Sequence, residues 1–250
     1  GISHWISSGG GSSWTNTSVW DSGEIHADVH DIYYLPNSAT AVFSCNDGGI
    51  FKSTDNGDLW TDISSNLAIG QVVGLGLSQT NSDFIVAGQQ DNGTNLKTAS
   101  SWTNINGGDG GECFVDYTNN NTIYVQYVEG KYSRSDDGGA NVNPIQTGLP
   151  TGMDFYSPFK IDPNNHLKIY SGGTPVLYTS NNKGDLWSPL GASSGTGTIK
   201  DFVVAPSNSA IIYTVQEDAI SKSTNSGASF TNITTGLPTD ASFKSITVSN

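Results

Sequence analysis

Positive charge is scarce in this sequence of 250 residues. Lysine and arginine together number 10 against 23 aspartates and glutamates, which leaves a net charge of −13, and Arg134 is the only arginine. A nucleic-acid-binding protein needs a basic surface to contact phosphates. A polybasic contact with a membrane needs the same kind of surface. The charge balance therefore argues against both roles.

Long apolar runs are also missing, so the sequence predicts no segment that spans a bilayer. The N-terminus has no basic region followed by an apolar stretch, as a signal peptide would. Because the chain begins at Gly1 rather than Met, we expect a processed or excised piece of a longer protein. Cys45 and Cys113 are too few to staple the fold, and we expect two buried thiols rather than a disulfide.

Charged residues make up only 13% of the chain, and no segment has helical periodicity. What the sequence has instead is 30 glycines and many short runs of β-branched and aromatic residues, broken by Asn, Asp, Gly and Pro. This composition indicates an all-β protein of short strands and tight turns. A single β-rich domain of this length is ordinary.

One short string returns four times along the chain, in the form Ser-x-[Asp/Asn]-x-Gly-x-x-[bulky]. The first copy is "KSTDNGDLW" at 52–60. The anchors of the four copies are Ser53, Asp55, Gly57, Trp60; Ser135, Asp137, Gly139, Val142; Ser180, Asn182, Gly184, Trp187; and Ser223, Asn225, Gly227, Phe230. A chain that repeats itself in this way predicts a repeat architecture.

The spacing of the repeat predicts the number of units. The last three serines of the motif are 45 and 43 residues apart, and the first gap of 82 residues leaves room for a degenerate unit. That unit is "LKTASSWTNI" at 96–105, which keeps Trp102. A further partial copy, "SSGGGSSW", lies near the N-terminus. We therefore expect six units of the length of a propeller blade.

Each unit reads as four short strands, as in "VHDIYYLP", "TAVFSCND", "GIFKSTDNG" and "DLWTDIS". Four antiparallel strands repeated radially predict a single six-bladed β-propeller over 1–250. The sixth blade is expected to be shared by the two termini. Its first strand would be at 242–249 and its third and fourth strands at 2–14, a closure that protects the open edge.

The repeated string falls between the third and fourth strands of a blade. There the Asp or Asn side chain can accept backbone N–H groups, Gly can take a left-handed conformation, and the aromatic residue can pack between blades. The string resembles the Asp box of sialidases, sortilin-type receptors and xyloglucan-degrading propellers. We interpret it as structural rather than catalytic.

Longer strings carry a second resemblance. "HADVHDIYYLPN", "CNDGGIFKSTDNGDLWTDISSNLAIGQ", "GQQDNGTN" and "GGDGGECFVDYTNNNTIYV" follow one another between 26 and 125. Together they resemble secreted Asp-box (BNR-repeat, sortilin- and sialidase-like) propeller proteins of bacteria with type IX secretion, and the resemblance covers the whole chain. It implies export and display at the cell surface. It implies no single activity.

Unusual polar residues gather at the opposite end of the predicted blades, where first strands begin and second strands end. They come mainly from the first three complete blades, with Glu217 and Asp218 from a later one. The predicted ligand-binding residues are His26, Asp28, His30, Asp47, Gln90, Asp91, Asp109 and Glu112, with Asp31, Asn46, Gln89 and Asn92 beside them. We predict that at least three of the acidic and histidine side chains converge.

Several kinds of site fit this set of residues. Carboxylate and amide oxygens suit Ca²⁺, for which Asp28, Asp47, Asp91 and Asp109 are the predicted ligands. Two histidines with carboxylates could hold a transition metal, although this spacing is weaker evidence on a strand than on a helix. The same side chains beside Trp and Tyr suit sugar hydroxyls. Alternatively, they cap turns and satisfy buried backbone groups.

Enzymatic alternatives can be weighed from the sequence as well. Sialidases clamp a substrate carboxylate with three arginines, and a chain with one arginine cannot do so. Endo-acting xyloglucanases place their cleft between two propellers, whereas this sequence predicts only one, so half of such a cleft would be missing. A glycosidase with paired carboxylates stays open, with candidates Asp28, Asp47, Asp91, Asp109 and Glu112.

The sequence thus favours a secreted or cell-surface propeller that acts as a binding or scaffold module for glycan or a partner protein. A polysaccharide-active glycoside hydrolase, or a fragment of one, is the alternative. Carboxylate pairs about 5 to 10 Å apart in an open groove would favour hydrolysis over binding.

Overall fold

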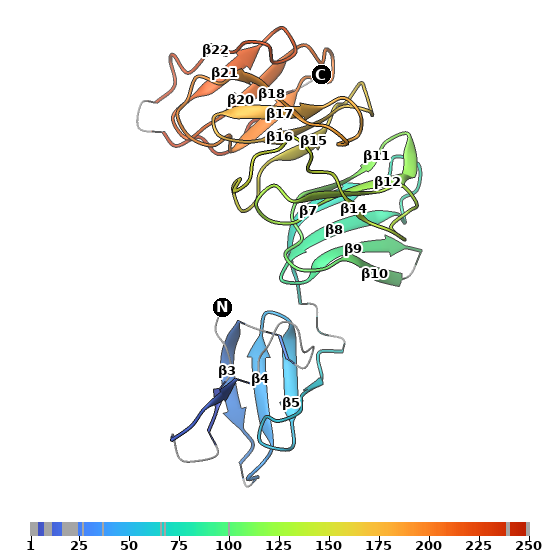
Figure 1. Ribbon diagram of the computed structural model, residues 1–250, viewed down its shortest axis with the longest axis vertical. Coiled ribbons are helices and arrows are strands. Elements are labelled where there is room, and N and C mark those ends of the chain that lie inside the picture. The colour runs from blue at the N-terminus through green and yellow to red at the C-terminus, as the bar shows by residue number, and fades with distance from the viewer. Residues whose placement is uncertain are drawn as a thin grey trace. The chain divides into compact units, whose positions relative to one another are not determined.

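The computed structural model describes residues 5–7, 12–16, 25–26, 28–36, 38–65, 67, 69–99, 101–238 and 241–248. These residues form 22 β-strands and no helix (Figure 1). Accordingly, the described part of the chain offers no helix long and apolar enough to cross a membrane. The chain divides into two compact units, Gly1–Gln71 (unit 1) and Val72–Asn250 (unit 2).

Five four-stranded antiparallel sheets contain all strands but two. In every one of them the strands are hydrogen-bonded in chain order, as a meander. Sheet 1, in unit 1, consists of β3 (Val29–Tyr34), β4 (Val42–Asn46), β5 (Gly49–Ser53) and β6 (Thr61–Asp62). It is preceded by a two-stranded sheet of β1 (Trp5–Ile6) and β2 (Thr15–Asn16).

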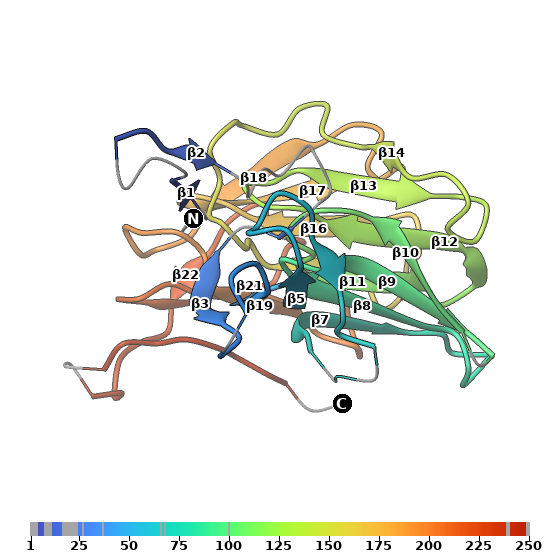
Figure 2. The same ribbon diagram turned by 90° about the horizontal axis from the view of Figure 1, so that it is seen from below.

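Unit 2 holds the other four sheets, which follow one another along the chain (Figure 2). Sheet 2 consists of β7 (Gln71–Leu77), β8 (Ile85–Gln90), β9 (Gly93–Thr98) and β10 (Ser101–Asn106). Sheet 3 consists of β11 (Cys113–Asp116), β12 (Asn119–Gln126), β13 (Tyr132–Ser135) and β14 (Asn143–Pro144). Sheet 4 consists of β15 (Phe159–Ile161), β16 (Ile169–Gly172), β17 (Val176–Ser180) and β18 (Ser188–Ala192). Sheet 5 consists of β19 (Asp201–Val204), β20 (Ile212–Val215), β21 (Ile220–Ser223) and β22 (Thr231–Asn232).

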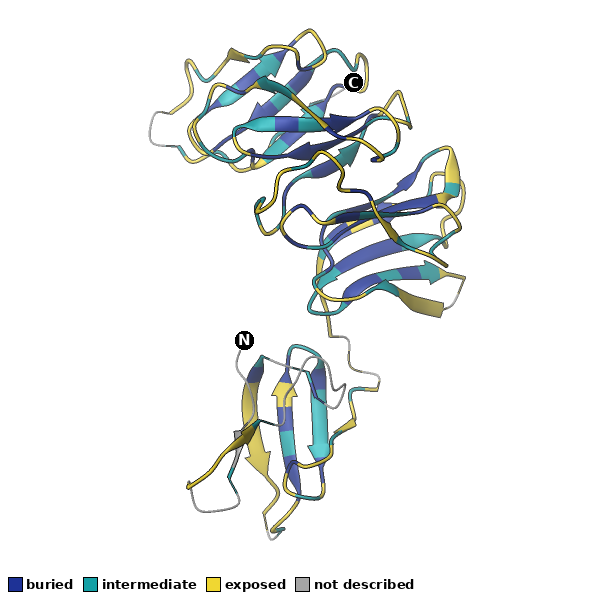
Figure 3. Cartoon of the chain, viewed as in Figure 1, coloured by how far each residue is buried: buried dark blue, intermediate teal, exposed yellow. Residues whose placement is uncertain are grey.

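The second strands of sheets 3 and 4 are buried on both faces, over the later part of β12 and the whole of β16. Side chains of a strand alternate between the faces of its sheet. On β12, Ile123 and Val125 therefore join a cluster with sheet 2, whereas Tyr124 joins a cluster with sheet 4. Figure 3 shows the resulting pattern of buried strand centres and exposed connecting loops.

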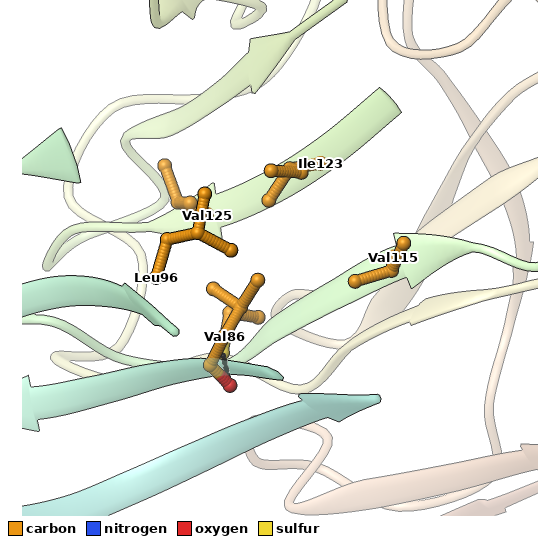
Figure 4. Close-up of a cluster of buried hydrophobic side chains, with 6 residues drawn as sticks. Val86, Leu96, Val115, Ile123 and Val125 are labelled. Atoms are coloured by element: carbon orange, nitrogen blue, oxygen red, sulfur yellow. Dashed lines mark hydrogen bonds between the residues drawn. The ribbon is translucent and has the colours of Figure 1, made fainter. Parts of the chain in front are cut away.

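The core of unit 2 lies between consecutive sheets. Val86 and Leu96 of sheet 2 pack on β11 and β12 of sheet 3, in the cluster drawn in Figure 4. Between sheets 3 and 4 the core is aromatic, and the rings of Tyr132 and Phe159 stack with centroids 4.2 Å apart. A third cluster, which includes Phe202, joins sheets 4 and 5. Sheets 3 and 4 each contribute side chains to two of these clusters, so the sheets of unit 2 depend on one another for their core.

The prediction of an all-β chain of four-stranded antiparallel units is confirmed, but the predicted number of units differs. The structure has five four-stranded sheets rather than six. Among the described residues, β1 and β2 pair only with each other, and 241–248 form no strand. That segment is held to sheet 5 instead, since the Phe243 N–H donates to Glu217 O and the Ile246 N–H to an Asp201 carboxylate oxygen. A sixth blade shared by the termini is therefore not formed by the described residues.

The prediction of two buried, unpaired cysteines is confirmed in part. Neither forms a disulfide. Cys113 is buried on β11, and burial raises the pKa of its thiol to about 12. Cys45 is exposed, so the expectation that both thiols are buried was wrong for this one. On β4 it alternates with Ser44 and Asn46, which occupy the buried face.

Candidate functional site

Four copies of one turn join the third and fourth strands of sheets 1, 3, 4 and 5, as the repeated string predicts. In sheet 4 the Ser180 hydroxyl donates to Asn182 Oδ1 at 2.7 Å and accepts the Gly184 N–H at 2.9 Å. Asn182 Oδ1 also accepts the backbone N–H of Leu186 at 3.0 Å. The same three bonds recur in the turns that begin at Ser53, Ser135 and Ser223. The serine and the Asp or Asn of each turn are thus engaged by the turn's own backbone.

The remaining anchors of these turns have local and packing roles. The glycines lie in the left-handed region, with φ of 95° at Gly57, 93° at Gly139, 96° at Gly184 and 85° at Gly227. Trp187 is only 2% exposed, and its Nε1 donates to Ile145 O of the neighbouring sheet at 2.7 Å. In the sheet 2 unit that lacks the motif, Trp102 is 54% exposed. The bonds of these turns are thus made within the turn or, for Trp187, to the neighbouring sheet.

The predicted site residues of unit 1 lie at the end of sheet 1 away from its repeated turn. His30 on β3 and Asp47 in the β4–β5 turn are joined by a bond of 2.5 Å from Nε2 to Oδ1. That bond and the charge of Asp47 raise the pKa of His30, and Asp28 contributes in the same direction. His26 packs against Gly48, where an added Cβ would lie 2.6 Å from the His26 Cβ. The structure thus brings these four predicted residues to one end of one sheet.

In unit 2, Asp91 and Asp109 come together. Asp91 follows β8 in a left-handed conformation, with φ of 61°, and its N–H donates to Asp109 Oδ1 at 3.1 Å. The carbonyl oxygen of Gln90 accepts the Asn92 side chain. Burial, supplemented by the charges of Asp109 and Asp91, raises the pKa of Tyr156 to about 12. The Tyr156 hydroxyl is buried without a hydrogen-bond partner among the described residues.

Glu112 belongs to a different feature, a cavity of about 310 Å³ that we call the Glu112 cavity. Its lining comes from the start of β11, the segment before β15, β15 itself, the start of β19 and the segment 241–248. The charged residues that line it are Glu112, Lys160, Lys200, Asp201 and Lys244, with Tyr156, Ser157, Pro158 and Ser245 between them. Three sheets of unit 2 thus contribute charged groups to one concave site.

The two carboxyl groups of this cavity are in different electrostatic environments. Burial raises the pKa of Glu112; Lys160 acts in the opposite direction, and Asp201 reinforces the rise. Asp201 instead accepts Lys160 Nζ at 2.5 Å, the Phe202 N–H at 2.8 Å and the Ile246 N–H at 2.9 Å. Asp201 is thus held by three hydrogen bonds, whereas burial raises the pKa of Glu112.

Sequence reasoning found Glu112 but missed the lysines and Asp201. A signal was present in "FKIDP" and "IKDFVV", where charged residues interrupt two otherwise apolar first strands. Lys160 is the second residue of β15, and Asp201 is the first residue of β19. They meet only because sheets 4 and 5 are neighbours, which the sequence does not show directly.

The predicted calcium ligands can be tested against their present contacts. Unit 1 contributes Asp28 and Asp47, and an Asp47 oxygen is already bonded to His30. Unit 2 contributes Asp91 and Asp109, and an Asp109 oxygen already accepts a backbone N–H. Ca²⁺ takes six to eight oxygen ligands. Among the described residues, two carboxylates in either unit taken by itself fall short of that number, and the calcium site stays a prediction.

Glu217 and Asp218 line a second and larger cavity of about 630 Å³, together with residues from 232–238 and 241–243. The Asp218 carboxylate accepts the Thr196 hydroxyl at 3.0 Å and its N–H at 3.3 Å. Glu217 accepts the Ser242 hydroxyl at 3.2 Å and lies 3.6 Å from Lys244 Nζ. Both carboxylates are thus engaged in holding surface loops.

Comparison with known proteins was informative at the level of structure alone. No protein-family model matches the chain, and no curated protein matches it in sequence. An ancestral GH74 enzyme superposes with a TM-score of 0.58 at 19% identity, over 86% of this chain and 32% of that one. The GH74 enzyme of Niastella koreensis gives 0.54 at 19% identity, over 82% and 38%. A structure described as the extracellular domain of a one component system from B. thetaiotaomicron gives 0.55 at 13% identity, over 93% and 31%.

These structures are β-propeller proteins, and they superpose on most of this chain. The fold is that of a β-propeller. The five four-stranded sheets are therefore propeller blades. The chain spans about a third of the length of these structures. At such low identity the similarity establishes the fold and leaves activity and ligand to the chain's own residues.

Proposed function

We propose that this propeller is a binding module of a secreted or cell-surface protein, and that it binds glycan in the Glu112 cavity. The observation that carries the proposal is the convergence of charged and hydroxyl groups from three blades on one cavity of about 310 Å³. That volume lies at the lower end of the roughly 300–1,000 Å³ typical of ligand sites. A ligand of one or two sugar rings fits such a space.

The lining offers both partners that sugar hydroxyls need. Lys200 and Lys244 are donors, and the Asp201 carboxylate is an acceptor. The exposed hydroxyl of Ser245 can act as either. Tyr156 and Pro158 supply apolar surface against which a sugar ring can pack. The repeated turns offer none of this, because their side chains are bonded to their own backbone.

Secretion or surface display is supported by the resemblance to exported Asp-box proteins. An extracellular domain also stands among the structures with the same fold. The low positive charge agrees with a partner other than nucleic acid. A protein partner in place of glycan would be indicated by binding that survives closure of the Glu112 cavity.

The proposal is tested by blocking the cavity. Ser245 is exposed and lines the cavity, so Ser245→Trp places an indole across it. Thr247 is exposed nearby and does not line the cavity, which makes Thr247→Trp the matched control. Isothermal titration of neutral and acidic oligosaccharides should show binding to the wild type and the control that Ser245→Trp loses. Binding by none of the three proteins would refute the proposal.

Glycoside hydrolysis is the second candidate function, favoured by the different environments of Glu112 and Asp201. A glycosidase needs one protonated and one ionised carboxyl group beside the scissile bond. Burial raises the pKa of Glu112, as a general acid requires, and Asp201 accepts Lys160 Nζ and two backbone N–H groups. Release of reducing ends from a polysaccharide by the wild type, but not by Glu112→Gln, would establish hydrolysis. Binding of the polysaccharide without any release of reducing ends would exclude hydrolysis and support a binding module.

A further inference from the structure

The Glu112 cavity has an unusual charge for this protein. The chain has a net charge of −13 and nine lysines beside its single arginine. Lys160, Lys200 and Lys244, a third of all its lysines, line this one cavity. If the nine lysines were spread evenly over the surface, three of them would not be expected to line one cavity. The lining itself holds these three lysines against two carboxyl groups, Glu112 and Asp201. A cluster of lysines in a concave site suits a negatively charged ligand.

The contacts of the lysines show which of them are available. Lys160 Nζ donates to Asp201 Oδ1 at 2.5 Å and to Phe202 O at 2.7 Å, so it is largely committed to the protein. Among the described residues, Lys200 Nζ makes one long bond of 3.4 Å, to Asp154. Lys244 Nζ lies 3.6 Å from Glu217. An ammonium group has three donors, so Lys200 and Lys244 can each bind a further acceptor.

Four carboxyl groups lie beside these lysines: Glu112 and Asp201 in the lining, and Asp154 and Glu217 outside it. The pairs of Asp154 with Lys200 and of Glu217 with Lys244 are long and exposed, and exposed ion pairs of this kind are weak, so a ligand can compete for both lysines.

Asp201 accepts Lys160 and two backbone N–H groups, so its charge is already matched. Glu112 faces Lys160 of β15 and Asp201 of β19, and Gln126 of β12 accepts its backbone N–H. Burial raises the pKa of the Glu112 carboxyl group. When Glu112 is protonated, the positive charge of the lining is largest.

We propose that the Glu112 cavity binds the carboxylate of an acidic sugar, such as a hexuronate, at Lys200 and Lys244. The inference rests on the proposed function and adds the class of glycan. The hydroxyls of the sugar then face Ser245 and Asp201, and its ring lies near Tyr156 and Pro158. A protein of net charge −13 repels polyanions in general, so binding of an acidic glycan requires a local site of this kind.

Protonation of Glu112 makes this binding depend on pH. A charged Glu112 repels the sugar carboxylate, and a protonated Glu112 can donate a hydrogen bond to it. As pH falls through the raised pKa of Glu112, the affinity for an acidic sugar therefore rises. Glu112→Gln keeps the shape and removes the titration, so its affinity should be the same at pH 5 and pH 8.

The experiment is isothermal titration of trigalacturonate and of neutral galactotriose at low salt, at pH 5 and pH 8. We expect the wild type to bind the acidic trimer about tenfold more tightly than the neutral one, and more tightly at pH 5. The double variant Lys200→Gln/Lys244→Gln should lose about tenfold for the acidic trimer alone. Lys131→Gln/Lys222→Gln, which removes the same charge elsewhere, should bind as the wild type does. Circular dichroism and thermal melting check that each variant is folded.

The outcomes separate this inference from the proposed function. Equal binding of both trimers, with no effect of the double variant, overturns the acidic-sugar site and leaves a glycan-binding module. Equal losses in both double variants would show that overall charge governs binding, and would also overturn the site. Binding of neither trimer at either pH overturns the inference together with glycan binding in this cavity.

Discussion

The two ends of the blades in unit 2 carry polar residues of opposite character. At one end, the repeated turns form the same hydrogen bonds in sheets 3, 4 and 5. In the turn of sheet 3, these bonds lower the pKa of Asp137 to about 2. At the other end every blade is different, and burial raises the pKa of Glu112 and Tyr156. Repetition with satisfied bonds indicates a structural role. Departure from the repeat, with groups held in costly environments, indicates a functional one.

The largest expected change in stability comes from removing the aromatic side chain that ends a repeated turn. Trp187→Ala should destabilise the protein by about 3–5 kcal/mol, because it removes a buried ring from the core between sheets 3 and 4. Denaturant titration measures the loss. Trp102 occupies the related position in sheet 2 but is 54% exposed. Trp102→Ala is therefore the control and should cost far less, and equal losses would contradict the packing role.

The serine of the repeated turn should have the next largest effect. Ser180→Ala removes a hydroxyl that serves Asn182 and the buried Gly184 N–H, which leaves buried groups unpaired. An unpaired buried group costs about 1–3 kcal/mol. The exposed Ser207→Ala should be near neutral in the same titration. A loss at Ser180 no larger than that at Ser207 would show that the turn geometry does not depend on its hydroxyl.

A pH profile sharpens the comparison further. Hydrogen bonds from Asn141 and Ser135 lower the pKa of Asp137 to about 2. Because the folded pKa lies below the unfolded one, the bonds stabilise the fold above about pH 4, and this is lost as pH falls through about 2. Asn182 and Asn225 fill the same position without titrating. The melting temperature of Asp137→Asn should therefore fall less between pH 4 and pH 2 than that of the wild type.

The matched control for this profile is Asp58→Asn, at an exposed aspartate in the turn of sheet 1. It removes one carboxylate without touching the bonds of the Asp137 turn. Its melting temperature should fall between pH 4 and pH 2 by as much as that of the wild type. If Asp137→Asn also follows the wild type, the bonds to that carboxylate do not contribute to acid stability.

The strands and the repeated turns could be predicted because their causes are local. Alternation of apolar residues and a Ser-x-Asp-x-Gly string each act within a few residues, and the bonds of Ser180 span four. The closing blade was predicted wrongly because it depends on pairing between the two ends of the chain. The Glu112 cavity was missed because Lys160 and Asp201 lie 41 residues apart in sequence and meet only across blades. Non-local meetings of this kind leave no periodic signal.

The smallest predicted effect concerns calcium at the acidic end of the blades. The sequence predicts Asp28, Asp47, Asp91 and Asp109 as ligands. Two carboxylates in a unit make a weak site, of the order of 10⁻⁴–10⁻³ M as in extracellular modules. Calcium at ten times such a Kd stabilises a native protein by about 1.4 kcal/mol. The melting temperature should therefore rise by a few degrees in excess Ca²⁺ and return with chelator.

Magnesium at the same concentration is the control for this measurement. Mg²⁺ demands a stricter octahedral geometry and loses its water reluctantly, so it should shift the melting temperature less. Asp91→Asn and Asp47→Asn should each reduce the calcium shift if those carboxylates are ligands. An unchanged melting temperature in Ca²⁺ would mean that the protein's own bonds hold these carboxylates, as His30 holds Asp47 and the Asp91 N–H holds Asp109. The acidic end of unit 1 would then belong with the repeated turns, and the Glu112 cavity alone would depart from them.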